Sequence, residues 1–118
     1  MYSQTANDHV ASARNVGKPE GCTHSGVVGA PGDGPFLAIH LTVVGGIVRA
    51  AGFNTWGCPA AIACGSCLSE MLEGRSLEEA RRISPKEIIA TLGGLPESKE
   101  GRAEMAVEAL QKALPEVT

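Results

Sequence analysis

Four cysteines carry most of the chemistry that this sequence could perform. They stand at positions 22, 58, 64 and 67, and the thiolate form of such a residue is both a nucleophile and a ligand for soft metal ions. Cys58 stands alone, Cys64 and Cys67 form a C-x-x-C pair, and Cys22 lies two residues before His24. What each thiol can do depends on the helix, strand or loop that holds it.

Cys58 lies where a helix is expected to begin. Pro59 follows it, and proline is well suited to the first position of a helix. The sulfur would then sit at the N-cap, where unpaired backbone N–H groups and the positive end of the helix dipole stabilise a thiolate and lower the thiol pKa. The alternative is a buried capping thiol, because free cysteine is often simply a small hydrophobe. We favour the functional interpretation.

Cys64 and Cys67 lie inside the same expected helix rather than at its start. At 100° per residue they point about 60° apart, and Cys64 lies about 240° around the helix from Cys58. The three thiols cannot easily share one ion. We therefore expect Cys64 and Cys67 to be core residues, as buried free cysteines commonly are.

The remaining candidates have ordinary explanations beside the functional one. Cys22 and His24 could bind a metal from a loop, but two ligands without a second pair are a weak signal. Asp33 lies in the turn-rich stretch GAPGDGP, where a carboxylate usually bonds its own backbone. His9 is expected on a helix surface and His40 on a sheet face. Common enzyme motifs are absent from the sequence, so we expect no enzyme.

These residues are positioned by a β-hairpin and several helices. The segment 36–44 is strongly strand-forming, Gly45-Gly46 suits a two-residue turn, and 47–53 is the expected return strand. Val27 and Val28 indicate a third, short strand. Strict alternation would place one set of return-strand residues on one sheet face and the rest on the other. The first set is Ile47, Arg49, Ala51 and Phe53; the second is Val48, Ala50 and Gly52.

Helices are expected at both ends of this hairpin. A light helix is predicted at 2–13, a small-residue helix at 60–73, and a short helix from the capping box of Ser76 and Glu79 through 82. Further helices are predicted at 84–92 and about 99–114. The fold class is therefore α+β, a small antiparallel three-stranded sheet with helices packed on one face.

Composition limits the function classes. With 118 residues and 43% hydrophobic content, residues 1–118 can form one domain. A net charge of -3 with scattered basic residues argues against nucleic acid and anionic membranes as partners. No signal peptide or membrane span is recognisable, so we expect a soluble cytoplasmic protein whose cysteines stay reduced.

Short motifs along the chain resemble the NifU N-terminal domain and the IscU-type iron-sulfur cluster assembly scaffolds. They cover essentially the whole chain with few if any gaps. In order they are Tyr2-Ser3, Asp8-His9, Arg14-Asn15-Val16-Gly17, Gly29-Ala30-Pro31, Phe53-Asn54-Thr55-Trp56-Gly57-Cys58, Ala61-Ile62-Ala63, Gly74-Arg75-Ser76-Leu77-Glu78-Glu79-Ala80 and Leu92-Gly93-Gly94-Leu95-Pro96.

The resemblance implies a site for a [2Fe-2S] cluster, or for iron or zinc, held by three cysteines and a nearby Asp or His. It carries the central cysteine onto Cys58 and the first onto Asp33, while the third falls on Arg102. Cofactor-binding and metal-binding residues are thus expected at Cys58 and Asp33. The chain looks like a divergent member lacking two of the three ligand cysteines. Glu100 or Glu104 could supply another oxygen, and Cys22 could replace a lost thiolate.

Three functions follow from this resemblance. The first is a divergent iron-sulfur cluster assembly scaffold or carrier that binds iron, zinc or a [2Fe-2S] cluster weakly around Cys58. The second is a cluster-free adaptor or regulator of the assembly machinery. The third is a persulfide-accepting sulfur carrier, with Cys58 as the nucleophile. The partner implied in each case is a cysteine desulfurase or another iron-sulfur assembly protein.

Overall fold

The described chain begins with one helix, continues with three strands and ends with the remaining helices. The structure, a computed structural model, describes residues 2–30, 32, 34–56 and 58–115. In this part of the chain the elements are α1 (Gln4–Ala11), β1 (His24–Val28), β2 (Phe36–Val44), β3 (Ile47–Trp56), α2 (Pro59–Leu72), α3 (Leu77–Arg81), α4 (Pro85–Thr91), the 3-10 helix η1 (Glu97–Lys99) and α5 (Gly101–Ala113). The predicted α+β class is confirmed.

The sheet is antiparallel throughout, with strand order β1-β2-β3. The predicted hairpin is present. Its turn uses Gly45 and Gly46 with φ of 61° and 76°, a conformation that suits glycine because it has no Cβ. The return strand continues three residues beyond its predicted end, to Trp56.

The predicted alternation along β3 is wrong in its first half because the strand contains a β-bulge. Thr42 pairs with Ala50, but the next residue, Val43, pairs with Val48. Arg49 is therefore an extra residue, and a bulge of this kind moves the residues before it to the opposite face. Val48 is buried on the helix side and Arg49 is exposed.

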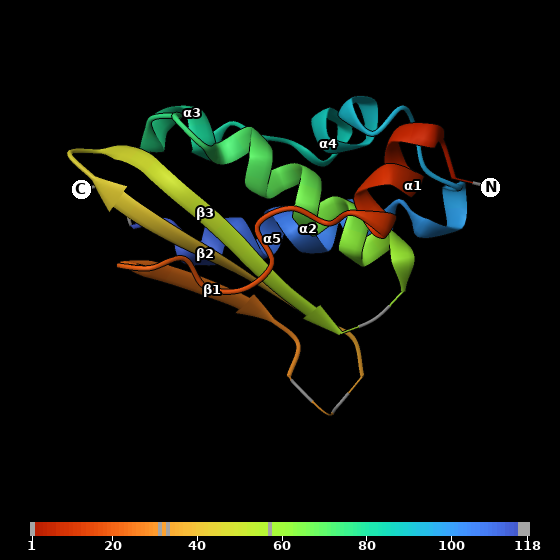
Figure 1. The fold of residues 1–118 in the computed structure, drawn as a ribbon, viewed down its shortest axis with the longest axis horizontal. Helices are drawn as coiled ribbons and strands as arrows, with labels where there is room; N and C mark the ends of the chain where they lie inside the picture. The colour runs from red at the N-terminus through yellow and green to blue at the C-terminus, as the bar shows by residue number, and fades with distance from the viewer. Residues whose placement is uncertain (1, 31, 33, 57, 116–118) are drawn as a thin grey trace.

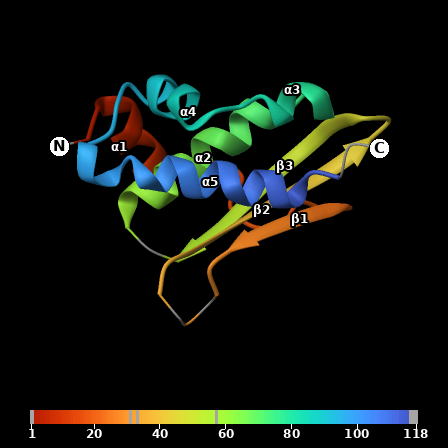
Figure 2. The same ribbon diagram turned by 180° about the vertical axis from the view of Figure 1, so that it is seen from behind.

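Helices α2 and α5 cover one face of the sheet, as predicted. Figure 2 shows α5 lying along the sheet, and the extensive contacts are of α2 with β3 and of α5 with β1 and β2. One cross-strand row, Gly26, Ile39 and Phe53, faces these helices. A Cβ on Gly26 would clash with the backbone of Ala109 in α5. The close approach of α5 to β1 therefore requires glycine at this position.

The short helices match their sequence signals. Ser76 and Glu79 form the predicted reciprocal capping box at the start of α3, and Ser84 caps α4. The C-terminal helix is slightly shorter than predicted, because η1 ends at Lys99 and α5 begins after its N-cap, Glu100. No helix in the described part of the chain is long and apolar enough to cross a membrane.

The first helix is fastened to α2 through a side chain that was expected on the surface. His9 is only 6% exposed, so its predicted surface position is wrong. Its Nδ1 lies 2.7 Å from Ser66 Oγ, which also accepts the Arg14 backbone N–H at 2.9 Å. Packing of α1 on α2 buries the imidazole, and Ser66 satisfies it.

The chain between α1 and β1 runs over the face of the sheet that the helices leave open (Figure 1). It first pairs with the edge of β3: the Gly17 amide donates to Phe53 O at 2.7 Å, and the Phe53 amide donates to Asn15 O at 3.0 Å. It ends beside β2, where the Thr23 amide donates to Leu41 O at 2.8 Å. This crossing segment, residues 17–23, gives the open face a partial cover.

Candidate functional site

Cys58 occupies the N-cap of α2, as predicted. Its backbone is extended, with φ of -81° and ψ of 167°, and Pro59 begins the helix. The Cys58 carbonyl accepts the Ala61 amide at 3.0 Å, which closes the first turn. The side chain is half-buried, so the sulfur lies at the surface end of the helix that covers β3.

The pKa of the Cys58 thiol is lowered from its ordinary value. Partial burial opposes the thiolate, but a hydrogen bond from Arg102 and the backbone amides of Ala61 and Ala60 favour it and outweigh the burial. The prediction that the helix start would make this thiol acidic is thus confirmed in direction. Of the contributions that lower this pKa, the hydrogen bond from Arg102 is the largest and those of the local amides are smaller. The main favourable contact therefore comes from a residue far away in the sequence.

Arg102 approaches Cys58 from the first turn of α5. Its Nε donates to Cys58 Sγ at 3.4 Å, and the two residues are 44 positions apart. A guanidinium cannot give up its proton at neutral pH, so a fixed positive charge lies beside the sulfur. This arrangement stabilises a sulfur anion and repels a metal cation.

The other two cysteines of α2, Cys64 and Cys67, are buried in the core, as predicted. Cys64 is 0% exposed and Cys67 is 1% exposed. Burial raises the pKa of Cys64 to about 12 and that of Cys67 to about 11. Neither thiol can act as a ligand or nucleophile at neutral pH without opening of the core.

The described residues contain no assembled metal site. Within residues 2–30, 32, 34–56 and 58–115, no group of three or more His, Cys, Asp or Glu side chains is placed to hold one metal ion. Glu100 and Glu104 are exposed. Asp33, the second predicted ligand, lies outside the described residues. A single thiolate beside a guanidinium does not match the thiolate cradle that iron-sulfur clusters require.

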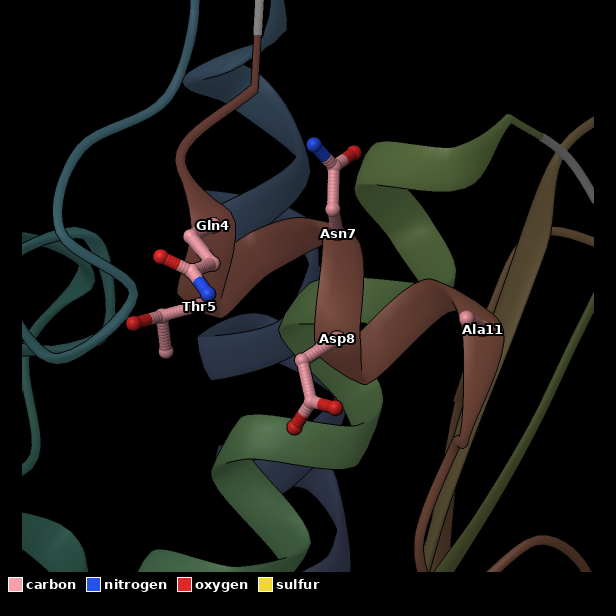
Figure 3. Close-up of a pocket in the computed structure, with 5 residues that line it drawn as sticks. All are labelled: Gln4, Thr5, Asn7, Asp8 and Ala11. Carbon is pink, nitrogen blue, oxygen red and sulfur yellow. The ribbon is translucent and has the colours of Figure 1, made fainter.

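A surface hollow in the described part of the chain lies elsewhere. It has a volume of about 560 Å³ and is lined by Gln4, Thr5, Asn7, Asp8 and Ala11 of α1 (Figure 3). Its one charged group, Asp8, is paired with Arg14 at 2.6 Å. A hollow on one short helix with a neutralised carboxylate offers no chemistry comparable to that of Cys58.

Sequence reasoning missed two polar clusters. One joins His9, Ser66 and Arg14, and the other joins Ser25, His40 and Asn54 on the open sheet face. Each depends on contacts between residues more than ten positions apart, so no local spacing marks them. The strand register alone would have placed Ser25 opposite His40.

A three-stranded antiparallel sheet has helices on one face, and a cysteine lies at the start of a covering helix. The protein is therefore a small α+β domain with a thiol at a helix N-terminus. Residues 1–117 match the family model for the NifU-like N terminal domain. The chain belongs to this family, which confirms the resemblance inferred from its motifs.

Relatives support this assignment, and a solved structure shares the fold. The chain is 39% identical over 114 residues to the iron-sulfur cluster assembly scaffold protein IscU 1 of Archaeoglobus fulgidus, covering 97% of this chain and 74% of that protein. It is 37% identical to IscU of Haemophilus influenzae, covering 96% and 92%. A Fervidobacterium islandicum structure, described as a SUF-system assembly scaffold, has the same fold with a TM-score of 0.73 at 16% identity, covering 97% and 96%.

Proposed function

We propose that this protein acts in iron-sulfur cluster assembly and that Cys58 is the residue that handles its cargo, by accepting sulfur. Two kinds of observation support the proposal. Relatives 33–39% identical over nearly the whole chain are named as assembly scaffolds. The observation that carries the sulfur chemistry is the contact of Arg102 Nε with Cys58 Sγ at 3.4 Å.

The geometry suits attack on a persulfide carried by another protein. The Cys58 thiolate attacks the outer sulfur of the donor R–S–SH, a new S–S bond forms on Cys58, and the donor S–S bond breaks. The donor leaves as a thiolate, R–S⁻, and no net oxidation occurs. The new Cys58–S–SH group then gives its proton to the departing R–S⁻, which becomes R–SH, and the terminal sulfur carries the charge. Arg102 favours first the attacking thiolate and then this persulfide anion, because a guanidinium donates charge-assisted hydrogen bonds to anions.

The partner implied by this chemistry is a cysteine desulfurase or another persulfide-bearing assembly protein. Trp56 is 71% exposed at the end of β3, two residues before Cys58 in the sequence. Aromatic side chains are enriched where proteins bind one another. A docked donor would thus find an exposed aromatic side chain close in the chain to the acceptor.

A second candidate is the scaffold role itself, favoured by the names of the relatives. Cys58 and Asp33 would hold iron, zinc or a [2Fe-2S] cluster, delivered as cargo. The charge of Arg102 opposes this, and iron-sulfur clusters are held mainly by thiolates. A site of one thiolate and one carboxylate would suit zinc or ferrous iron better than a stable cluster.

Persulfide transfer is the direct test of the first candidate. The reduced full chain is incubated anaerobically with a cysteine desulfurase and cysteine, trapped by alkylation and examined by peptide mass spectrometry. We expect one added sulfur on Cys58. In Cys58→Ser the modification should be lost from this peptide. Unchanged sulfur loading of the Cys58→Ser protein would show that the acceptor lies elsewhere.

A further inference from the structure

The open face of the sheet holds a second thiol in a cluster separate from Cys58. Ser25 on β1 pairs directly with His40 on β2, and His40 pairs with Gly52 on β3. Asn54, two residues beyond Gly52, points to the same face. Cys22, at the end of the crossing segment, adds its sulfur to this group. The strand register therefore brings a thiol, a hydroxyl, an imidazole and an amide together.

The hydrogen bonds of the cluster form a continuous chain. Cys22 Sγ lies 3.5 Å from Ser25 Oγ, Ser25 Oγ lies 2.8 Å from His40 Nδ1, and His40 Nε2 lies 2.8 Å from Asn54 Oδ1. Cys22 Sγ also lies 3.4 Å from the His24 carbonyl, which is a second acceptor for the thiol proton.

Asn54 determines the direction of the chain. An amide oxygen can only accept, so His40 Nε2–H donates to it and His40 Nδ1 carries the lone pair. Ser25 Oγ–H then donates to Nδ1, and Ser25 Oγ is left to accept the Cys22 thiol proton. The Ser25 hydroxyl thus connects a base, His40, to a nucleophile, Cys22.

Burial differs along the cluster in a way that suits reaction. His40 is only 6% exposed, whereas Ser25 is exposed and Cys22 is half-buried. The base is shielded from water while the sulfur remains open to a small reagent. Ser25 and Asn54 alone would satisfy both ring nitrogens of His40, so the structural needs of the imidazole do not require Cys22.

From this juxtaposition we infer that Cys22 is a second reactive thiol, which forms mixed disulfides with low-molecular-weight disulfides. His40 acts as its base through Ser25. Ser25 and His40 are positioning residues, because only Cys22 touches the substrate. The site is independent of the proposed sulfur transfer, since the hydrogen bonds of its residues in the described part of the chain do not involve Cys58 or Arg102.

The step balances as a thiol–disulfide exchange. The Cys22 proton passes to Ser25 Oγ as the Ser25 proton passes to His40 Nδ1, and the sulfur attacks one sulfur of R–S–S–R. A Cys22–S–S–R bond forms and the R–S–S–R bond breaks. The departing R–S⁻ takes a proton back from His40 and leaves as R–SH. Cys22 is oxidised and the departing sulfur is reduced.

The test measures mixed-disulfide formation with 2-hydroxyethyl disulfide, an uncharged reagent whose rate is not biased by Arg102. The reduced full chain is treated at neutral pH, quenched by alkylation, and the rate at each cysteine is read by peptide mass spectrometry. We expect Cys22 in native protein to react faster than in denatured protein. Ser25→Ala should slow it at least tenfold, a low estimate for a general-base contribution of about 10²–10⁴.

Ser25→Thr is the matched control, because it restores the hydroxyl at an exposed strand position that tolerates threonine. Its rate should stay close to that of the unchanged protein. Variants of His40 are less informative, since this buried side chain also supports the fold. The inference is overturned if Ser25→Ala reacts like the parent, if Ser25→Thr is as slow as Ser25→Ala, or if folding brings no acceleration.

Discussion

Cys58 and Arg102 are hydrogen-bonded and have different roles in the proposed chemistry. The thiol supplies the nucleophile, and the guanidinium, 3.4 Å from Sγ, decides which cargo is compatible with it. A sulfur anion gains from the neighbouring charge, whereas a metal cation must displace it. At this scale the chemistry of the site depends on one side chain that stands where the family resemblance would place a third cysteine.

Removal of the guanidinium should make the Cys58 thiol less acidic. In Arg102→Ala the hydrogen bond that lowers the pKa is lost while the opposing burial remains, so the pKa should rise. The thiolate absorbance of the protein as a function of pH measures this shift, and alkylation of Cys58 at neutral pH should slow several-fold.

Arg49→Ala is the matched control for this substitution. It removes the same charge from the exposed β3 bulge without touching Cys58. An equal change in both variants would assign the effect to net charge and remove the special role of Arg102.

The lowered pKa of the Cys58 thiol could be predicted from the sequence, but its hydrogen bond with Arg102 could not. Pro59 marks the helix start, and the helix start determines the amides that face the sulfur. The charge of Arg102 was foreseen at the lost ligand position, whereas its Nε–Sγ hydrogen bond depends on how α5 packs beside α2. Asp33, the other predicted ligand, remains a prediction.

At the scale of elements, α1 is held to α2 by a buried histidine. Ser66 Oγ lies 2.7 Å from His9 Nδ1, and Glu70 Oε1 lies 3.6 Å from His9 Nε2. The pKa of His9 is lowered, first by burial and then by Arg14, with Glu70 and Asp8 opposing. The α1–α2 contact is therefore built around a neutral imidazole.

Acid should weaken this contact. Because the folded-state pKa of His9 lies below the unfolded value of about 6.5, the stability it contributes is complete above about pH 6.5 and is lost as the pH falls toward the folded-state value. Urea unfolding at about pH 7.5 and about pH 5.5 should show a larger loss for the parent than for His9→Gln, which can still bond Ser66 but does not titrate. Equal losses in both proteins would contradict a role for His9.

At the scale of the whole molecule, sequence patterns predicted the layers but not the exceptions within them. The hairpin and the capping box are local signals, and both appear where predicted. The bulge at Arg49 has no local mark and shifts the face of Val48. The burial of His9 and the Ser25–His40–Asn54 chain depend on which segments meet in space, and periodicity along one element contains no such information.

The central claim is that Cys58 accepts sulfur rather than holding a metal, and one stoichiometric measurement separates the two. The full chain is given ferrous iron, cysteine and a cysteine desulfurase anaerobically, and Cys58-bound sulfur and protein-bound iron are measured on the same sample. We predict close to one sulfur per Cys58 and far less than one iron per chain. Iron bound at about one or more per chain, lost in Cys58→Ser and accompanied by no persulfide, would contradict the account, because a real metal site binds stoichiometrically.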